Sequence, residues 1–156
     1  MLIRQILSVA TIQLAVATVA VAAPVTGTMT VGGRAIEITD VSAVAMTGGA
    51  DDPAWQLVFS EQEHSHDVEG QKRALRGEHG LAFAVEVLAS GEGHNFVIYQ
   101  LEPDGMGPYP SSFPWPQVSG FNAGEGRLRG TLSNNPDFPY QDIVFALDFD
   151  APIVSP

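Results

Sequence analysis

Apolar and polar residues alternate in short runs along most of the chain. The clearest run is QDIVFALDFD, residues 141–150, in which Ile143, Phe145, Leu147 and Phe149 occupy alternate positions. Because successive side chains of a β-strand point to opposite faces, this period of two predicts a strand with one buried face. The same kind of pattern recurs in six further runs: residues 25–31, 36–46, 55–60, 81–89, 94–101 and 126–133.

Glycine, proline, aspartate and asparagine separate these runs. Gly32-Gly33 is a two-residue link of the kind that closes β-hairpins, and the segments 47–53 and 134–139 have loop composition. No long stretch shows the 3.6-residue period of an amphipathic helix. We therefore predict an all-β fold: a single antiparallel β-sandwich or open barrel of about seven to nine strands.

The first residues form a separate unit. Residues 1–22 contain one charge, Arg4, then an alanine-rich apolar run that ends in the small-x-small sequence AVA. This composition is typical of a signal peptide cleaved after Ala22. The alternative is a membrane anchor, but the run is short of the roughly 20 strongly apolar residues that a spanning helix needs. We predict a signal peptide at 1–22 and a secreted domain at 23–156, in the periplasm or outside the cell.

Composition narrows the classes of partner. The chain has 18 acidic residues against 7 Lys and Arg, a net charge of −11, and contains no cysteine. An acidic surface repels nucleic acid and anionic lipid, so we expect neither as a partner, and no stable membrane insertion once the signal is cleaved. Without disulfides, an exported domain depends on burial of apolar side chains. The expected partner is a protein, peptide or glycan of unknown identity.

The segment SEQEHSHDVEG, residues 60–70, is the strongest candidate for metal chemistry. His64 and His66 are two positions apart, so an extended backbone presents both imidazoles on one side, and Asp67 and Glu69 follow closely. Imidazole and carboxylate are ligands of zinc and related metals. The alternative is a solvated, charged loop. His79 and His94 would join a metal site only if the fold brings them near.

The segment GPYPSSFPWP, residues 107–116, combines four prolines with three aromatic residues, Tyr109, Phe113 and Trp115. Proline fixes φ and biases its predecessor to extended geometry, so this backbone is stiff. Aromatic rings on a stiff loop are a candidate binding surface for a sugar or peptide. The alternative is that Phe113 and Trp115 fold back and cap one end of the core.

No catalytic motif is evident. The chain has no G-x-S-x-G sequence and no cysteine, and its paired carboxylates lie in a loop (Asp51-Asp52) or on the outer face of a strand (Asp148 and Asp150). We therefore predict a non-catalytic binding or structural module. Two alternatives remain: a metal-binding protein that uses the His64/His66 loop, and a protease-inhibitor-like module that presents the proline-rich loop.

The two ends of the chain carry a resemblance. GTMTVGGRAIEITDVSAVA near the start, and GRLRGTLS and IVFALDFDAPIV near the end, have hairpin glycines and alternating apolar residues in a characteristic order. In these motifs the chain resembles a group of small exported bacterial β-domains of unknown function. The resemblance implies a β-fold and carries no catalytic residue onto this sequence.

Overall fold

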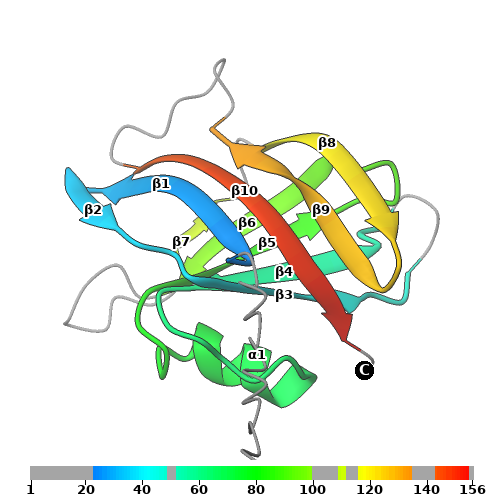
Figure 1. The fold of residues 1–156 in the computed structure, drawn as a ribbon, viewed down its shortest axis with the longest axis horizontal. Helices are drawn as coiled ribbons and strands as arrows, with labels where there is room; N and C mark the ends of the chain where they lie inside the picture. Colours follow the sequence, from blue (N-terminus) through cyan, green and yellow to red (C-terminus); the bar gives the residue numbers. More distant parts are fainter. Residues whose placement is uncertain (1–22, 49–51, 100–108, 112–115, 135–142, 155–156) are drawn as a thin grey trace, which may run out of the picture.

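The computed structural model describes residues 23–48, 52–99, 109–111, 116–134 and 143–154 (Figure 1). This part of the chain is mostly β, with one short helix, α1 (Val68–Leu75). The strands are β1 (Val25–Val31), β2 (Arg34–Ile36), β3 (Asp40–Ala45), β4 (Trp55–Ser60), β5 (Ala82–Val87), β6 (Gly93–Tyr99), β7 (Tyr109–Ser111), β8 (Gln117–Gly124), β9 (Arg127–Ser133) and β10 (Ile143–Val154). The prediction of a mostly β fold is confirmed.

The strands pair in the order β2-β1-β10-β3-β4-β5-β6-β7, with β9 on β10 and β8 on β9. Every pairing is antiparallel except that of β10 with β3, which is parallel at Ile153↔Ala43 and Val154↔Val44. The sheet is therefore mixed, and the prediction of a purely antiparallel one was wrong at this pairing. The ten described strands exceed the seven to nine predicted, because the run predicted at 36–46 divides into the end of β2 and β3, and because β7 and β8 were not predicted. β7 has only three residues, and β8 has a register shift between Ser119 and Asn122 that breaks its period of two.

β10 has the side-chain pattern that its sequence predicts. Phe145, Leu147 and Phe149 are buried, whereas Val144, which precedes them on the other face, is 60% exposed. The hairpin predicted at Gly32-Gly33 is also present, since β1 and β2 pair antiparallel on either side of it. The sequence pattern therefore predicted β10, the face that it buries, and the first hairpin.

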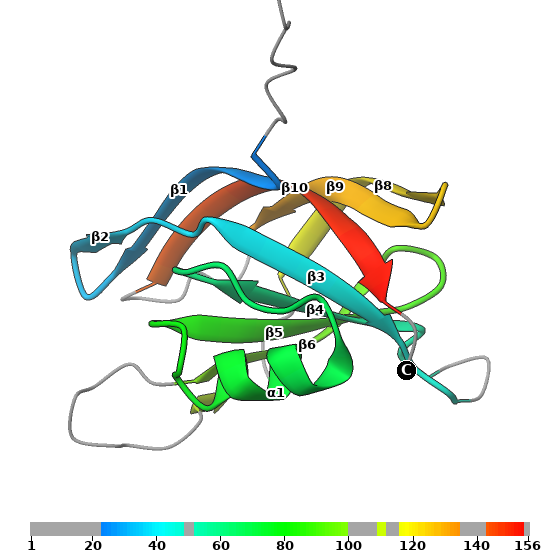
Figure 2. The ribbon, with the colours of Figure 1, turned by 60° about the horizontal axis from the view of Figure 1, so that its bottom comes forward.

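The core lies between two groups of strands. Figure 2 shows β1, β10, β9 and β8 above β3, β4, β5 and β6. Phe59 of β4 stacks on Phe83 of β5, with ring centroids 4.8 Å apart, and meets the edge of Phe149 of β10 at 5.8 Å. Because these three rings come from both groups, burial of aromatic surface holds the groups together.

Helix α1 covers the opposite face of β4 and β5 (Figure 2). Ala74 and Leu75 pack there against Val58, Ala82 and Ala84. In the alternating run 55–60, Val58 lies on the face opposite to Leu57 and Phe59, and the helix buries it completely. We did not predict this helix, because its eight residues carry too few apolar side chains for a clear 3.6-residue period.

Several predicted segments lie wholly or partly outside the described residues. The predicted signal peptide, residues 1–22, lies outside them, and so do Phe113 and Trp115 of the proline-rich segment. Tyr109 begins β7, which pairs only with β6 among the described strands. Such an edge position suits Pro110, which has no N–H to donate. Within the described residues, no helix is long and apolar enough to cross a membrane.

Candidate metal centre

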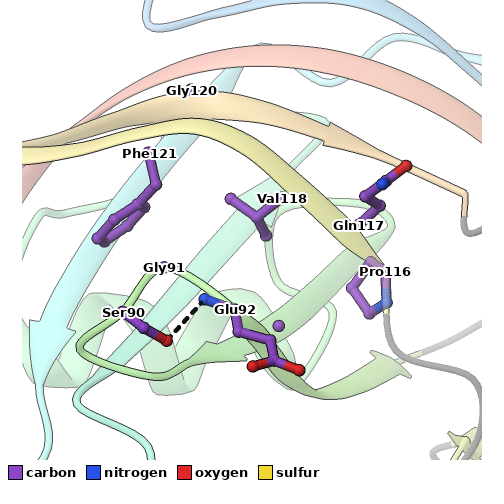
Figure 3. Close-up of a pocket in the computed structure, with 9 residues that line it drawn as sticks. Ser90, Gly91, Glu92, Pro116, Gln117, Val118, Gly120 and Phe121 are labelled. Carbon is purple, nitrogen blue, oxygen red and sulfur yellow. Dashed lines mark hydrogen bonds between the residues drawn. The ribbon is translucent and has the colours of Figure 1, made fainter.

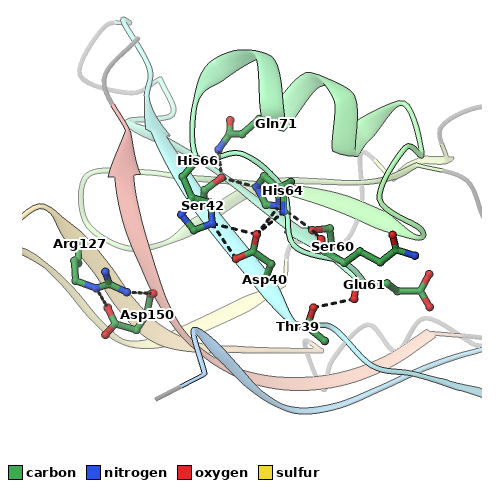
Figure 4. Close-up of polar contacts among 11 residues, drawn as sticks. Thr39, Asp40, Ser42, Ser60, Glu61, His64, His66, Gln71, Arg127 and Asp150 are labelled. Atoms are coloured by element: carbon green, nitrogen blue, oxygen red, sulfur yellow. Dashed lines mark hydrogen bonds and ion pairs between the residues drawn. The ribbon is translucent and has the colours of Figure 1, made fainter. Parts of the chain in front are cut away.

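A buried polar cluster lies where β3, β4 and the segment before α1 meet (Figure 4). Asp40, the first residue of β3, is paired in register with Ser60, the last residue of β4. The chain that leaves β4 therefore starts beside Asp40. His64 and His66 lie on this connection, which returns over β3 before α1 begins.

Asp40 is the centre of the cluster. Its Oδ2 accepts a hydrogen bond from the backbone N–H of His64 at 2.9 Å and lies 2.9 Å from His64 Nδ1. Its Oδ1 lies 2.9 Å from Nε2 of His66. One carboxylate thus holds both imidazoles of the H-x-H sequence.

The same contacts keep Asp40 ionised. Burial by itself would raise the pKa of this carboxyl, but hydrogen bonds from the side chain and backbone of His64, and from His66, outweigh burial and lower the pKa to about 2. Asp40 is therefore a carboxylate at neutral pH, the form that binds metal ions.

His64 is surrounded by hydroxyl groups. Its Nε2 lies 2.7 Å from Oγ of Ser42, which in turn accepts a hydrogen bond from the Gln71 side chain at 3.0 Å. Its Nδ1 also lies 2.8 Å from Oγ of Ser60. Within the described residues, every buried side-chain nitrogen and oxygen has a hydrogen-bond partner. The cluster is therefore a fully connected polar network inside the fold.

The geometry fits a metal ion. One ligand atom each from Asp40, His64 and His66 lie within 4.8 Å of one another, and the two imidazole centroids are 5.4 Å apart. Two imidazoles on one tetrahedral ion, with metal–nitrogen bonds of about 2.0–2.1 Å, place their centroids about 5 Å apart. Ligand atoms on such an ion are about 3.3 Å apart. The two 2.9 Å contacts of Asp40 would therefore open by a few tenths of an ångström, and the ligand nitrogens of the two histidines, which lie within 4.8 Å of each other, would adjust to the same spacing.

The cluster is open on one side. The His64 side chain is fully buried and that of Asp40 is 4% exposed, whereas that of His66 is 36% exposed. An ion held by these three groups therefore has access to solvent past His66. An open position next to three protein ligands is found in catalytic zinc sites, whereas structural zinc sites are closed by four protein ligands.

The structure brings together only part of the predicted ligand set. His64 and His66 converge, but the carboxylate comes from Asp40, which we did not predict, and not from Asp67 or Glu69. Asp67 is the N-cap of α1 and accepts the Gly70 N–H at 2.6 Å, and hydrogen bonds from Ser65 and Gly70 lower its pKa. Glu69 forms an ion pair with Arg76 at 2.9 Å.

The alternation of the sequence does not by itself place Asp40. Ile36 and Ile38 pack in the core, and so do Val41 and Ala43, so the period of two is broken before β3. Asp40 faces the other side of β3, where its backbone neighbour across the pair is Ser60 and where His64 lies. A simple continuation of the run would have put Asp40 on the core face, so the sequence could not have marked it as a partner of the histidines.

The other histidines lie in different places. The ring of His79 has its centroid 6.2 Å from that of His64, so it borders the cluster without joining it. His94 lies in β6 next to Gly93, which pairs with Val87 at the far end of β5 from His79. Three of the four histidines therefore gather at one end of the sheet.

The contacts around His64 have the connectivity of a hydrolase triad. The hydroxyl of Ser42 faces Nε2 of His64, and the carboxylate of Asp40 faces Nδ1. Ser42 is fully buried, however, and its oxygen is already bonded to Gln71. A substrate carbonyl cannot reach a hydroxyl in that position. The triad-like contacts therefore support the fold and orient His64, and they offer no nucleophile to a substrate.

An open hollow of about 760 Å³ lies between the β5–β6 loop and β8 (Figure 3). Ser90, Gly91 and Glu92 line one side; Gln117, Val118 and Phe121 line the other. Pro116, the last residue of the proline-rich segment, also lines it and is buried. The hollow therefore adjoins the segment for which the sequence predicted a ligand surface.

No protein-family model, no curated protein and no solved structure matches this chain. The resemblance of its two ends to small exported bacterial domains stays a prediction.

Proposed function

We propose that this chain is an exported, non-catalytic β-sandwich module that binds one divalent transition-metal ion through Asp40, His64 and His66. The observation that carries the proposal is the convergence of both imidazoles of the H-x-H segment on one buried, ionised carboxylate. The backbone that follows His66 is fixed, because Asp67 is the N-cap of α1 and the helix begins at the next residue.

The ligand set selects the class of metal. Two imidazole nitrogens and one carboxylate oxygen suit zinc, copper, nickel or iron, whereas calcium and magnesium prefer a shell made only of oxygen atoms. His64 would bind through Nδ1, since its Nε2 faces Ser42, and His66 would bind through Nε2. Zinc is the natural first probe because its preferred tetrahedral geometry matches the ring spacing.

The fold and the compartment form part of the proposal. Contact between Phe59 of β4 and Phe149 of β10 supports a sandwich, because the two strands belong to different groups and meet only through side chains. The sequence of residues 1–22 supports export, and the absence of cysteine fits a domain held together by apolar burial. The inaccessibility of Ser42 supports a non-catalytic role.

The test compares zinc binding by the wild-type protein with zinc binding by the His66→Ala variant. Calorimetry should detect saturable zinc binding to the wild-type protein near neutral pH, and zinc at 100 times Kd should stabilise the native state by about 2.7 kcal/mol. The His66 side chain is 36% exposed, so its removal should leave the fold intact. It should weaken zinc binding by more than about 100-fold, beyond the loss expected for a residue that only supports a ligand.

His94→Ala is the matched control, because His94 lies at the opposite end of β5 from this cluster. This variant should bind zinc as the wild type does. Wild-type protein that binds neither zinc, copper nor nickel would reject the metal proposal and leave the cluster as a polar clamp between β3 and the segment before α1.

The proline-rich loop remains a second prediction for function. Phe113 and Trp115 lie outside the described residues, and the hollow beside Pro116 is the observation that favours a protein, peptide or glycan ligand there. A protease-inhibitor-like role for the same loop also stays a prediction.

A further inference from the structure

We propose that Ser42, held in place by Gln71, hydrogen-bonds Nε2 of His64 in both the metal-free and the metal-bound state, so that Nδ1 stays directed at Asp40 and the metal, and that Ser42 is thus a positioning residue of the site. This inference rests on the proposed function, because it concerns the same metal centre. It assigns a role to two buried polar residues, Ser42 and Gln71, that contribute no metal ligand themselves.

The contacts of the metal-free arrangement define one tautomer of the neutral His64 ring. The Ser60 hydroxyl donates to the backbone oxygen of Gln62 at 2.7 Å, so its oxygen is left to accept from Nδ1 at 2.8 Å. Asp40 Oδ2 is a second acceptor at Nδ1. Nδ1 therefore carries the hydrogen, and Nε2 accepts the hydroxyl hydrogen of Ser42 at 2.7 Å.

Metal binding requires the opposite tautomer. A metal on Nδ1 needs the lone pair of that nitrogen, so the hydrogen of the neutral ring must move to Nε2. The Ser42 oxygen can then accept it, because a hydroxyl has two lone pairs and Gln71 uses only one of them. Ser42 then changes from donor to acceptor in its hydrogen bond with the ring. A hydroxyl can hydrogen-bond to Nε2 in both tautomers. An amide N–H at this position could only donate to Nε2, and a carbonyl could only accept from it.

Gln71 holds the Ser42 oxygen in place beside Nε2 of His64. It lies on α1, is 4% exposed, and donates its side-chain N–H to the Ser42 oxygen at 3.0 Å. Its own backbone N–H bonds to the carbonyl oxygen of Asp67, so the cap of α1 holds it in position. The hydrogen bond of a ligating histidine to such a partner orients the ring and typically contributes 10–100-fold to metal affinity.

The first experiment measures the tautomer directly. Nitrogen-15 NMR of the His64 ring should identify hydrogen on Nδ1 in chelator-treated wild-type protein, and hydrogen on Nε2 after addition of zinc. Zinc bound to Nε2 in the wild type would overturn the inference. Because this measurement uses the unmodified protein, it does not depend on how any variant folds.

The second experiment measures zinc affinity in Ser42→Ala and Ser42→Thr. Alanine removes the acceptor for Nε2–H, so the dissociation constant should rise 10–100-fold, and threonine, which keeps the hydroxyl, should restore it to within about threefold of wild type. Ser90→Ala, in the β5–β6 loop, is the matched control and should leave affinity unchanged. Unchanged zinc affinity in Ser42→Ala would reject the role of Ser42 but would leave the proposed metal site standing. Absence of zinc binding to the wild type would reject the proposed function and this inference with it.

Discussion

Asp40 is the residue on which the candidate site depends. It is 3% exposed, and its oxygen atoms contact one backbone N–H and two imidazoles. An isolated buried carboxylate is costly, so this charge persists in the fold only because these contacts replace water. The same contacts make the stability of the fold depend on pH.

We expect the Asp40 carboxylate to stabilise the metal-free protein down to moderately acidic pH. Its pKa falls from 3.8 to about 2 on folding, so its contribution is complete above about pH 4 and is lost as pH falls through about 2. A shift of that size corresponds to about 2 kcal/mol. Urea unfolding of wild type and Asp40→Asn in chelator, from pH 5 to pH 2.5, should give a stability difference that shrinks with falling pH. A constant difference over this range would contradict the assigned contacts.

Gly27 sets the distance between β1 and β10. It has a φ of 130°, and a Cβ on it would overlap the carbonyl oxygen of Ala146 on the paired strand. Gly27→Ala should therefore destabilise the domain by about 3 kcal/mol, through backbone strain added to overpacking. Thermal or urea unfolding measures this loss. Gly126→Ala is the control: it also has positive φ, but its Cβ meets open space, and it should cost about 1 kcal/mol.

At the level of elements, helix α1 and the segment before it close the candidate site. The helix is short, and its packing on β4 and β5 uses small residues, chiefly Ala74 against Ala82 and Ala84. A helix of eight residues is marginal by itself, so tertiary contact and capping decide whether it forms. The Asp67 cap therefore contributes both to α1 and to the order of the adjoining His66.

Asp67→Ala should destabilise the protein by about 1 kcal/mol, the usual cost of losing an N-cap side chain. The reason is that the Gly70 N–H, which Asp67 accepts at 2.6 Å, would be left to water. Urea unfolding at neutral pH measures the change. Glu63→Ala, an exposed acid on the same segment, should change stability by less than about 0.5 kcal/mol, and equal effects of the two substitutions would rule out the cap as the cause.

At the scale of the whole molecule, β10 connects the two groups of strands. It pairs with β1 and β9 over most of its length and with β3 at its end, and its inward rings reach β4 and β5 across the core. Stability should therefore be concentrated in the aromatic contacts between β10 and the strands opposite.

Phe149→Ala should lower the free energy of unfolding by 3–5 kcal/mol, because it leaves a cavity beside Phe59 where the two groups of strands meet. Denaturant unfolding followed by circular dichroism measures the loss. Val144→Ala, on the outward face of the same strand and 60% exposed, should cost less than about 0.5 kcal/mol. A loss below about 1 kcal/mol for Phe149→Ala would contradict the packing of these rings.

The sequence by itself determined where most strands lie and which faces they bury. Alternation is a local property: moving one residue along a strand reverses the face, so Phe145, Leu147 and Phe149 must share one side in any fold that contains β10. The H-x-H pair is local for the same reason, and it was recognised from spacing alone. β7 and α1 were missed because they carry too few apolar residues for a clear period, and β8 was missed because a register shift between Ser119 and Asn122 interrupts its alternation.

Only the tertiary structure decided which strands pair and which groups meet. The parallel contact of β10 with β3 joins residues more than 100 positions apart, and no local pattern encodes such a choice. Asp40 precedes His64 by 24 positions, and they meet because β3 and β4 pair in the register that sets Asp40 beside Ser60. Asp67 and Glu69 are nearer to His64 in the sequence, but neither faces it. Asp67 caps the N-terminus of α1, and Glu69 forms an ion pair with Arg76 on the exposed surface of the helix. The candidate ligand set is therefore a consequence of strand register, which depends on the packing of the whole core.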